Sequence, residues 1–287
     1  NLVLIVHGPG LYSLLAHLKQ DSVVVKEGQF VRRGEVLGAC GSSGRSPRPH
    51  LHVQFQGTER VGAPTLAAAF HEVIEAEAEG EHLFATFVPA EDNVVRNLDP
   101  QPDLERLFAL PVGESLALTP AKGGAAETLE PEIDLYGNLL LREPALGATL
   151  WYENRAGLFV AWDTDAPPRS ALADLLAALP RVPYDAGRDL IWRDVVAARA
   201  FRPWLLRMLR DWAAPFLPLG GYRMTYRMQR KGAELIVRGS SDLCDAAGTP
   251  LLASEAHLAD GRGVTQIAVT HRGATRQWVR TSPPDAV

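Results

Sequence analysis

Cysteine, long apolar runs and excess positive charge are all scarce in this sequence. Its two cysteines, Cys40 and Cys244, are too few and too far apart to indicate a disulfide scaffold or a thiolate metal site. A single long-range bridge is the most that they allow. No apolar run approaches the roughly 20 residues that span a bilayer, so no transmembrane segment is expected. The formal net charge of -5 provides no broad cationic field for nucleic acid.

A recognisable start is also lacking. Asn1 takes the place of an initiator methionine, and residues 2–6 already have the apolar pattern of a strand inside a sheet. We therefore expect a fragment of a longer protein, whose targeting segment would lie outside it.

What is present predicts a mainly β protein with two domains. A chain of 287 residues that is 46% hydrophobic can fill two cores. Residues 1–56 combine short Val-, Leu- and Phe-rich runs with glycine turns, which predicts antiparallel hairpins. We expect an antiparallel β core in residues 1–60, a helix and linker in 61–100, and a second, α+β domain of antiparallel strands with a helical insertion in 101–287.

The histidines give the first indication of chemistry. Four of the eight lie within the first 52 residues, and His50 and His52 form a His-x-His pair. Alternate side chains of a strand share one face, so both rings would face one site. Neutral imidazole is both a common zinc ligand and a good base near neutral pH. The pair therefore predicts a site of metal binding and proton transfer, or else a polar face turned to solvent.

Further motifs surround this pair in a fixed order. The chain contains Val-His-Gly-Pro-Gly at residues 6–10, Tyr-Ser-Leu-Leu-Ala-His-Leu at 12–18, spaced glycines at 28, 34 and 38, Gly-Ser-Ser-Gly at 41–44 and Pro-His-Leu-His at 49–52. This order and spacing resemble the lysostaphin-type zinc endopeptidases, the LytM-like peptidoglycan hydrolases. The resemblance covers about the first fifth of the chain.

The resemblance implies a fold, a cofactor and a substrate. The fold would be an antiparallel core of the duplicated hybrid motif type, and the substrate would be the peptide cross-links of peptidoglycan. The cofactor would be Zn²⁺, with His52 as a ligand. Zinc would polarise the scissile carbonyl and activate water, with His50 as the base and His17 stabilising the oxyanion. The location would be the bacterial cell envelope, either periplasmic or secreted.

The sequence departs from the family pattern in the number of zinc ligands that it contains. The other two zinc ligands of the family come from a His-x-x-x-Asp motif that lies upstream of the strand with which this chain opens. A catalytic zinc usually needs three protein ligands, so His52 alone should not hold the metal. Val53 and Gln54 replace the usual Phe and Glu, which leaves the histidine pair intact.

Two alternatives stay open. The pattern of residues 25–34 also occurs in biotinyl and lipoyl carrier domains, although Lys26 is followed by Glu27-Gly28 and a carrier has no use for Pro-His-Leu-His. The second alternative is a metal-free member of the same fold that binds or regulates another cell-wall hydrolase.

The remainder of the chain predicts an accessory domain without a catalytic motif. Helices are expected at residues 64–79, 170–179 and 186–216, the last kinked at Pro203. A linker is expected at 97–102, with the domain boundary near residue 100. Aromatic side chains between 192 and 216 are expected in the core. His71 and His82 are expected outside any site, and His257 and His271 are expected to be isolated and to face solvent. Candidate ligands of this domain are wall glycan and an envelope protein. Strands are expected at 132–143, 148–163, 222–230, 233–238, 251–258, 264–271 and 275–281.

Overall fold

A computed structural model describes residues 1–155, 157–187, 189–197 and 221–281. The chain forms two compact units, Asn1–Phe70 and His71–Val287. Strands predominate in both, which confirms the expected fold class. Within the described residues the two cysteines are free, and neither helix has the length or apolar character to cross a membrane.

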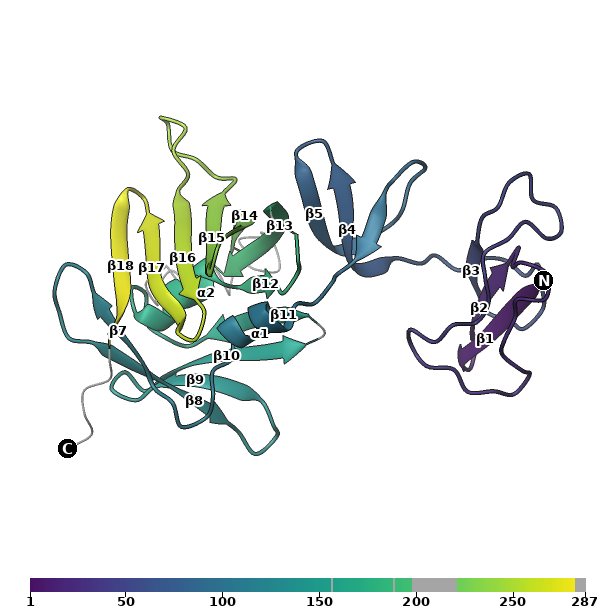
Figure 1. The fold of residues 1–287 in the computed structure, drawn as a ribbon. Coiled ribbons are helices and arrows are strands. Elements are labelled where there is room, and N and C mark those ends of the chain that lie inside the picture. The colour runs from purple at the N-terminus through teal and green to yellow at the C-terminus, as the bar shows by residue number, and fades with distance from the viewer. Residues whose placement is uncertain (156, 188, 198–220, 282–287) are drawn as a thin grey trace, which may run out of the picture. The chain divides into compact units, whose positions relative to one another are not determined.

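The first unit is a small antiparallel sheet with long loops (Figure 1). Its strands are β1 (Leu2–Gly8), β2 (Leu11–Ala16) and β3 (His52–Gln56), in the order β1-β2-β3. The chain between β2 and β3 runs out and back as an extended hairpin, in which Lys19 N donates to Ala39 O (2.8 Å) and Val24 N to Leu37 O (3.0 Å). Gly28 and Gly34 turn this excursion with φ of 78° and 83°, values that glycine adopts readily.

The second unit begins with strands where a helix was expected. The prediction of a helix at 64–79 is wrong, because residues 70–77 form strand β4. Ile74 pairs with Arg96 across the ladder between β4 and β6. The strands of this region are β4 (Phe70–Glu77), β5 (Gly80–Phe87) and β6 (Val95–Asn97).

This region belongs to the second unit for identifiable reasons. Strand β5 pairs in parallel with β13 (Asp189–Ala197). Arg96 donates two hydrogen bonds to the buried Asp185 (2.9 and 2.6 Å) and two more to Glu81 (2.7 and 2.6 Å). These contacts place the division of the chain after Phe70, earlier than the boundary expected near residue 100.

A long curved sheet makes up most of the second unit (Figure 1). Its strand order is β12-β11-β10-β9-β8-β7-β18-β17-β16-β15-β14-β13-β5-β4-β6. The last five strands in the sequence form an antiparallel meander at the positions expected from the sequence. The further strands are β7 (Leu116–Pro120), β8 (Glu127–Ile133), β9 (Leu139–Glu143), β10 (Ala148–Arg155), β11 (Leu158–Thr164), β12 (Arg181–Pro183), β14 (Gly221–Lys231), β15 (Glu234–Ser241), β16 (Leu252–Ala259), β17 (Gly263–His271) and β18 (Ala274–Thr281).

Two helices accompany the sheet within the described residues, α1 (Pro102–Leu107) and α2 (Ala171–Ala178). All eight residues of α2 are buried, and seven of them are apolar, as expected of a helix enclosed in a core. The eighth, Asp174, is paired with Arg276. It packs on β10, β11, β15, β16 and β17. Ser170 caps it, since Ser170 Oγ accepts a hydrogen bond from Ala173 N (3.2 Å). The expected helix at 170–179 is therefore confirmed.

The expected helix at 186–216 is wrong over the part that the structure describes. Residues 189–197 form β13, which pairs with β14 along its whole length. Trp192 is buried and stacks on Tyr226, with ring centroids 5.6 Å apart, as a core residue should. The rest of that prediction, including Pro203 and the aromatic residues from 201 to 216, lies outside the described residues.

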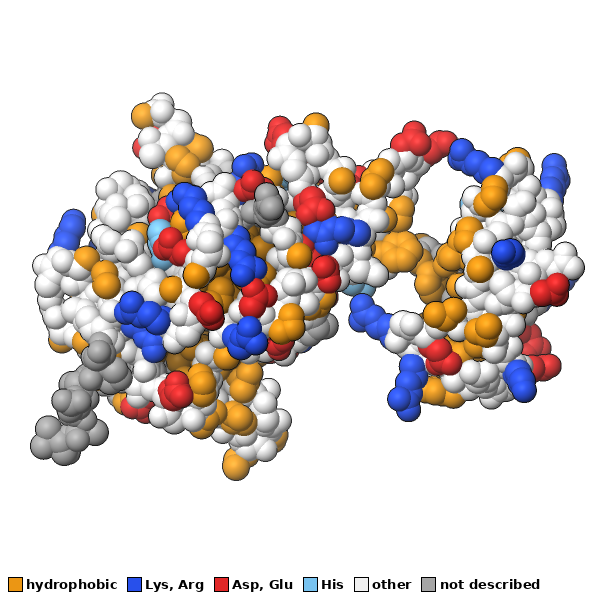
Figure 2. Space-filling model, in the orientation of Figure 1, with side chains coloured by type: hydrophobic (Ala, Val, Ile, Leu, Met, Phe, Trp, Pro, Cys, Tyr) orange, Lys and Arg blue, Asp and Glu red, His pale blue; other side chains and the backbone are white. Residues whose placement is uncertain are grey.

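Charges of both signs are interspersed over the visible face of the second unit (Figure 2). This distribution agrees with the small negative net charge. No single-sign field of the kind that attracts nucleic acid is visible on that face.

Candidate functional site

Three histidines from separate segments of the first unit converge. His17 follows the end of β2, His52 opens β3, and His50 forms an isolated bridge with Gly41, in which His50 N donates to Gly41 O (3.0 Å). The ring centroid of His17 lies 4.7 Å from that of His50 and 5.9 Å from that of His52. His50 and His52 are exposed, whereas His17 is half-buried. The three rings thus lie close together, and the catalytic and metal-binding roles expected of them stay predictions.

The environment of His50 fixes which ring nitrogen carries the proton. Nδ1 lies 2.9 Å from Arg48 O and 3.1 Å from Ser46 Oγ, while the Ser46 hydroxyl itself donates to Arg48 O (2.7 Å). A carbonyl oxygen can only accept, so Nδ1 is the donor. In the neutral ring, Nε2 then keeps its lone pair and can accept a proton.

His17 is held in a similar way by a glycine-bounded loop. Its Nδ1 donates to Ser43 O (2.8 Å). The backbone of His17 has φ 62°, a left-handed conformation that costs a non-glycine residue about 1 kcal/mol. Such backbone strain persists only where the surrounding structure fixes it, and it is concentrated at functional sites.

Gly41 allows this loop to approach the strand end closely. A Cβ atom at Gly41 would lie 2.5 Å from both Cα and N of Lys19. That distance is too short for any side chain. The loop can therefore pass this close to the backbone of Lys19 only if residue 41 is glycine. The Gly-x-x-Gly spacing thus has a steric cause at its first glycine.

A ladder of glutamines orients His52. Gln54 Nε2 donates to Ala63 O (3.1 Å) and to Gln56 Oε1 (2.9 Å), so its amide oxygen faces His52 Nε2 at 3.2 Å. Gln56 is fully buried and donates to Thr58 O and Arg60 O. The His52 Nε2–H is therefore the donor, and the lone pair of the neutral ring lies on Nδ1. Gln54, at the position where the family pattern has Glu, keeps the acceptor that this orientation needs.

A catalytic zinc ion usually requires three protein ligands. In residues 1–155, 157–187, 189–197 and 221–281 no group of three or more His, Cys, Asp or Glu side chains is arranged to hold a metal ion. His52 could supply one ligand through Nδ1, but a three-ligand zinc site is not formed by these residues alone.

The structure also adds residues that sequence patterns did not single out. Ser46 and the carbonyl groups of Ser43 and Arg48 set the histidine tautomers, and only the position of the Gly-x-x-Gly motif hinted at this loop. His7 stays apart from the three rings, with its Nε2 2.8 Å from Ser13 Oγ.

Two histidines of the second unit differ from expectation. His257 lies between Glu234 and Glu255, and His271 lines a cavity 2.9 Å from the Tyr222 hydroxyl. Both are partly buried, so their description as isolated, solvent-facing residues is wrong. His82 is also partly buried, whereas His71 is exposed.

The three histidines lie inside a segment that is similar to known proteins. Residues 1–64 match the model of peptidase family M23. The chain is 50% identical over 54 residues to the DD-carboxypeptidase/endopeptidase Mpg of Neisseria meningitidis serogroup B, and 48% identical over 54 residues to that of Neisseria gonorrhoeae. Each alignment covers 19% of this chain and 12% of the relative, so the chain spans about an eighth of the relatives' length. No solved structure matches.

Proposed function

We propose that this chain, whose residues 1–64 match the model of peptidase family M23, is part of a peptidase that hydrolyses peptide bonds of bacterial peptidoglycan. The observation that carries the proposal is the convergence of His17, His50 and His52 within the matched segment. The substrate lies in the bacterial envelope, so we place the protein there, as a periplasmic or secreted enzyme.

His50 is proposed as the general base. Its Nδ1–H is occupied by Arg48 O and Ser46 Oγ, which leaves Nε2 to take a proton from the attacking water. The exposed position of the ring lets a substrate reach it. Ser46 is a positioning residue in this scheme, because it contacts the ring and not the substrate.

His17 is proposed to stabilise the oxyanion. Its Nδ1–H is held by Ser43 O, so a second donor becomes available at Nε2 only when the ring is protonated. A cationic ring beside the developing negative charge would contribute electrostatic stabilisation of the transition state.

Zinc is proposed as the cofactor, with His52 as the ligand that this segment contributes. The described residues do not complete a zinc site, so we propose that the remaining ligands come from a His-x-x-x-Asp motif that is not among these residues. The chain alone should bind zinc weakly, because one ligand offers little binding free energy. Tight stoichiometric binding in a zinc titration of the 287-residue chain would contradict this assignment.

Residues 101–287 are proposed as an accessory region that contributes no catalytic group and binds wall glycan or an envelope protein. The support is that these residues belong to a unit with its own core and with no histidine cluster among its described residues. The proposed role of this region is therefore to bind a ligand or to control access of substrate to the histidine site, and not to take part in the chemical step.

The test uses the protein extended by the segment that precedes Asn1. Zinc content and digestion of purified peptidoglycan are measured for the wild type and for His52→Ala, His50→Ala and His7→Ala. Because the relatives' name combines a carboxypeptidase and an endopeptidase, digests are analysed for both released terminal residues and opened cross-links.

Each variant has a distinct expected result. His52→Ala should lose metal and activity together, whereas His50→Ala should keep its metal and lose about 10²-fold or more in rate. His7→Ala is the control, since His7 is an exposed histidine of the same sheet that lies apart from the three rings. Near-normal turnover by His50→Ala would remove that residue from the mechanism. An extended protein that binds no zinc and cleaves nothing would favour the non-catalytic alternative, a regulator of another wall hydrolase.

A further inference from the structure

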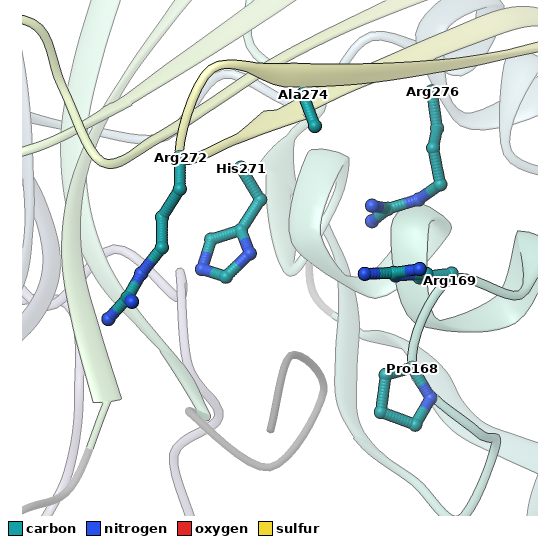
Figure 3. Close-up of a pocket in the computed structure, with 6 residues that line it drawn as sticks. All are labelled: Pro168, Arg169, His271, Arg272, Ala274 and Arg276. Carbon is teal, nitrogen blue, oxygen red and sulfur yellow. The ribbon is translucent and has the colours of Figure 1, made fainter. Parts of the chain in front are cut away.

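A cavity in the second unit is lined almost entirely by cationic and neutral side chains. Its volume is about 290 Å³, and its lining residues are Pro168, Arg169, His271, Arg272, Ala274 and Arg276. They come from the loop before α2 and from the hairpin that joins β17 to β18 (Figure 3). None of the six is acidic. The ends of the Arg169 and Arg276 side chains reach the same side of this space, whereas the Arg272 side chain extends away from them, so Arg272 has to turn inward to contact a ligand there (Figure 3).

Only one of the three arginines has its charge compensated by a described residue. Arg276 donates to both carboxylate oxygens of the buried Asp174 (2.8 and 2.5 Å). Within the described residues, neither Arg169 nor Arg272 forms an ion pair. The described lining therefore carries more positive than negative charge. Arg169 and Arg272 are exposed, so their guanidinium groups are hydrated and open to an anion.

The backbone positions of these two arginines are unusual. Arg169 has φ 77° and Arg272 has φ 51°, both in the left-handed region. Arg272 and Gly273 form the two-residue turn between the paired residues His271 and Ala274. Turns of this kind favour Asn-Gly or Gly-Gly, because both central residues need positive φ. Arginine thus occupies two positions where asparagine or glycine would fold more easily.

His271 reports the electrostatic potential of the cavity. Burial lowers the pKa of His271, and the nearby charges of Arg272, Arg276 and Arg169 lower it further, against a smaller opposing effect of Asp174. The ring also lies 2.9 Å from the Tyr222 hydroxyl. A negative charge bound among the arginines would act in the opposite direction.

We propose that this cavity is a binding site for a small oxyanion, a phosphate or carboxylate group, held by Arg169 and Arg272 with the remaining donors of Arg276. Guanidinium groups form bidentate, charge-assisted hydrogen bonds with both of these groups. The volume lies at the lower limit for ligand sites, which selects a small molecule or a single anionic group of a larger one. This site is separate in the sequence from the three histidines of the first unit, and it does not depend on the peptidase proposal.

The 287-residue chain is titrated with inorganic phosphate, with succinate and with sodium chloride at matched ionic strength. Binding is followed by calorimetry and by the ring resonances of His271, assigned with His271→Gln. We expect saturable binding of phosphate or succinate, and the more effective of the two identifies the class of ligand. The pKa of His271 should rise when the site is occupied.

Arg272→Asn and Arg169→Asn remove the proposed contacts and suit the left-handed backbone. Each should weaken anion binding by about tenfold, the effect of losing one charge-assisted hydrogen bond, without loss of stability. Arg262→Asn is the matched control, because Arg262 is exposed and lies just before β17, at the opposite end of that strand from His271.

The proposal is overturned if phosphate and succinate act no differently from chloride. It is also overturned if Arg262→Asn weakens binding as much as Arg272→Asn does, since the effect would then be one of net charge. Unchanged thermal unfolding of the two cavity variants ensures that weaker binding reflects the site and not the fold.

Discussion

The two units of this chain differ most in what they bury. In residues 1–70 the buried apolar side chains are Leu14 and Leu18, while many large ones, such as Val6 and Phe30, are exposed. The second unit instead has a continuous apolar core that encloses α2. The proposed catalytic histidines thus lie on a scaffold with little buried apolar surface, from which we expect low stability in isolation.

The units also differ in how polar groups are held. Two of the three buried carboxylates among the described residues of the second unit are paired with arginines, Asp174 with Arg276 and Asp185 with Arg96. In the first unit, backbone carbonyls orient His17 and His50, and the buried polar side chain with most partners is the neutral Gln56. In the second unit, ion pairs therefore hold the buried polar groups. In the first unit, the positions of backbone carbonyls in the loops hold the histidine rings.

The largest expected effect concerns folding of the separated units. Residues 71–287 expressed alone should unfold cooperatively in urea, because their core is complete. Residues 1–70 alone should show no cooperative transition, since two buried apolar side chains cannot stabilise a sheet of this size. Circular dichroism during urea titration measures both. A cooperative transition of the 1–70 piece would show that its loops provide more stability than their burial indicates.

Removing a buried carboxylate should be the next largest effect. Asp174 is fully buried and accepts hydrogen bonds from Arg276 and from Trp278 Nε1 (2.9 Å). Asp174→Ala leaves both donors without their partner, so we expect a loss of about 3 kcal/mol in the free energy of unfolding. The midpoint of urea unfolding measures this loss. Asp260→Ala, at an exposed aspartate of the same unit, is the control and should change stability by less than about 0.5 kcal/mol.

A smaller and local effect is expected in the first unit. Gly41→Ala places a Cβ atom 2.5 Å from the backbone of Lys19, so the loop must move away from the end of β2. The ring resonances of His17 and His50 should shift, because their partners Ser43 and Arg48 lie on this loop and just after it. Gly8→Ala is the control, since a Cβ atom there meets nothing within 4 Å. Equal shifts in both variants would mean that the loop does not fix the rings.

Sequence patterns predicted the second unit best where neighbouring strands are also consecutive in the chain. The meander from β14 to β18 is an example, because its alternating residues and glycine turns are local signals. The helix expected at 64–79 failed because Val73 and Ile74 fit both a helical and an extended pattern. Their pairing with residues 95–97 and the parallel pairing of β5 with the distant β13 decide the outcome.

The histidine site could be predicted for a different reason. The order of motifs predicted that His17 lies near His50 and His52, as the ring distances show. His50 precedes β3 and pairs only with Gly41, so alternation along one strand does not account for its position. The tautomers could not be predicted, because they depend on where the carbonyl groups of Ser43 and Arg48 point. The paired glutamates of His257 were missed as well, since Glu234 lies on the neighbouring strand.

The smallest expected effect is the pH dependence that His257 gives the second unit. Its Nδ1 lies 2.6 Å from Glu234 and its Nε2 lies 2.6 Å from Glu255, which also accepts from Arg238. Burial alone would lower the pKa of His257, but hydrogen bonds to both glutamates outweigh burial and raise it. This pairing with carboxylates contrasts with the carbonyl partners of His17 and His50.

The sign of the effect follows from this raised pKa. A histidine with a higher pKa in the folded state than its unfolded value of about 6.5 contributes its full stabilisation below that value. The contribution disappears as pH rises through the folded-state pKa. We expect at most about 1 kcal/mol, as for other partly exposed ion pairs. Urea unfolding of residues 71–287 between pH 5.5 and 9, compared with His257→Gln, isolates it. If the wild type and His257→Gln lose stability in parallel over that range, the glutamates do not stabilise a charged His257. His257 would then not differ in this respect from the histidines of the first unit.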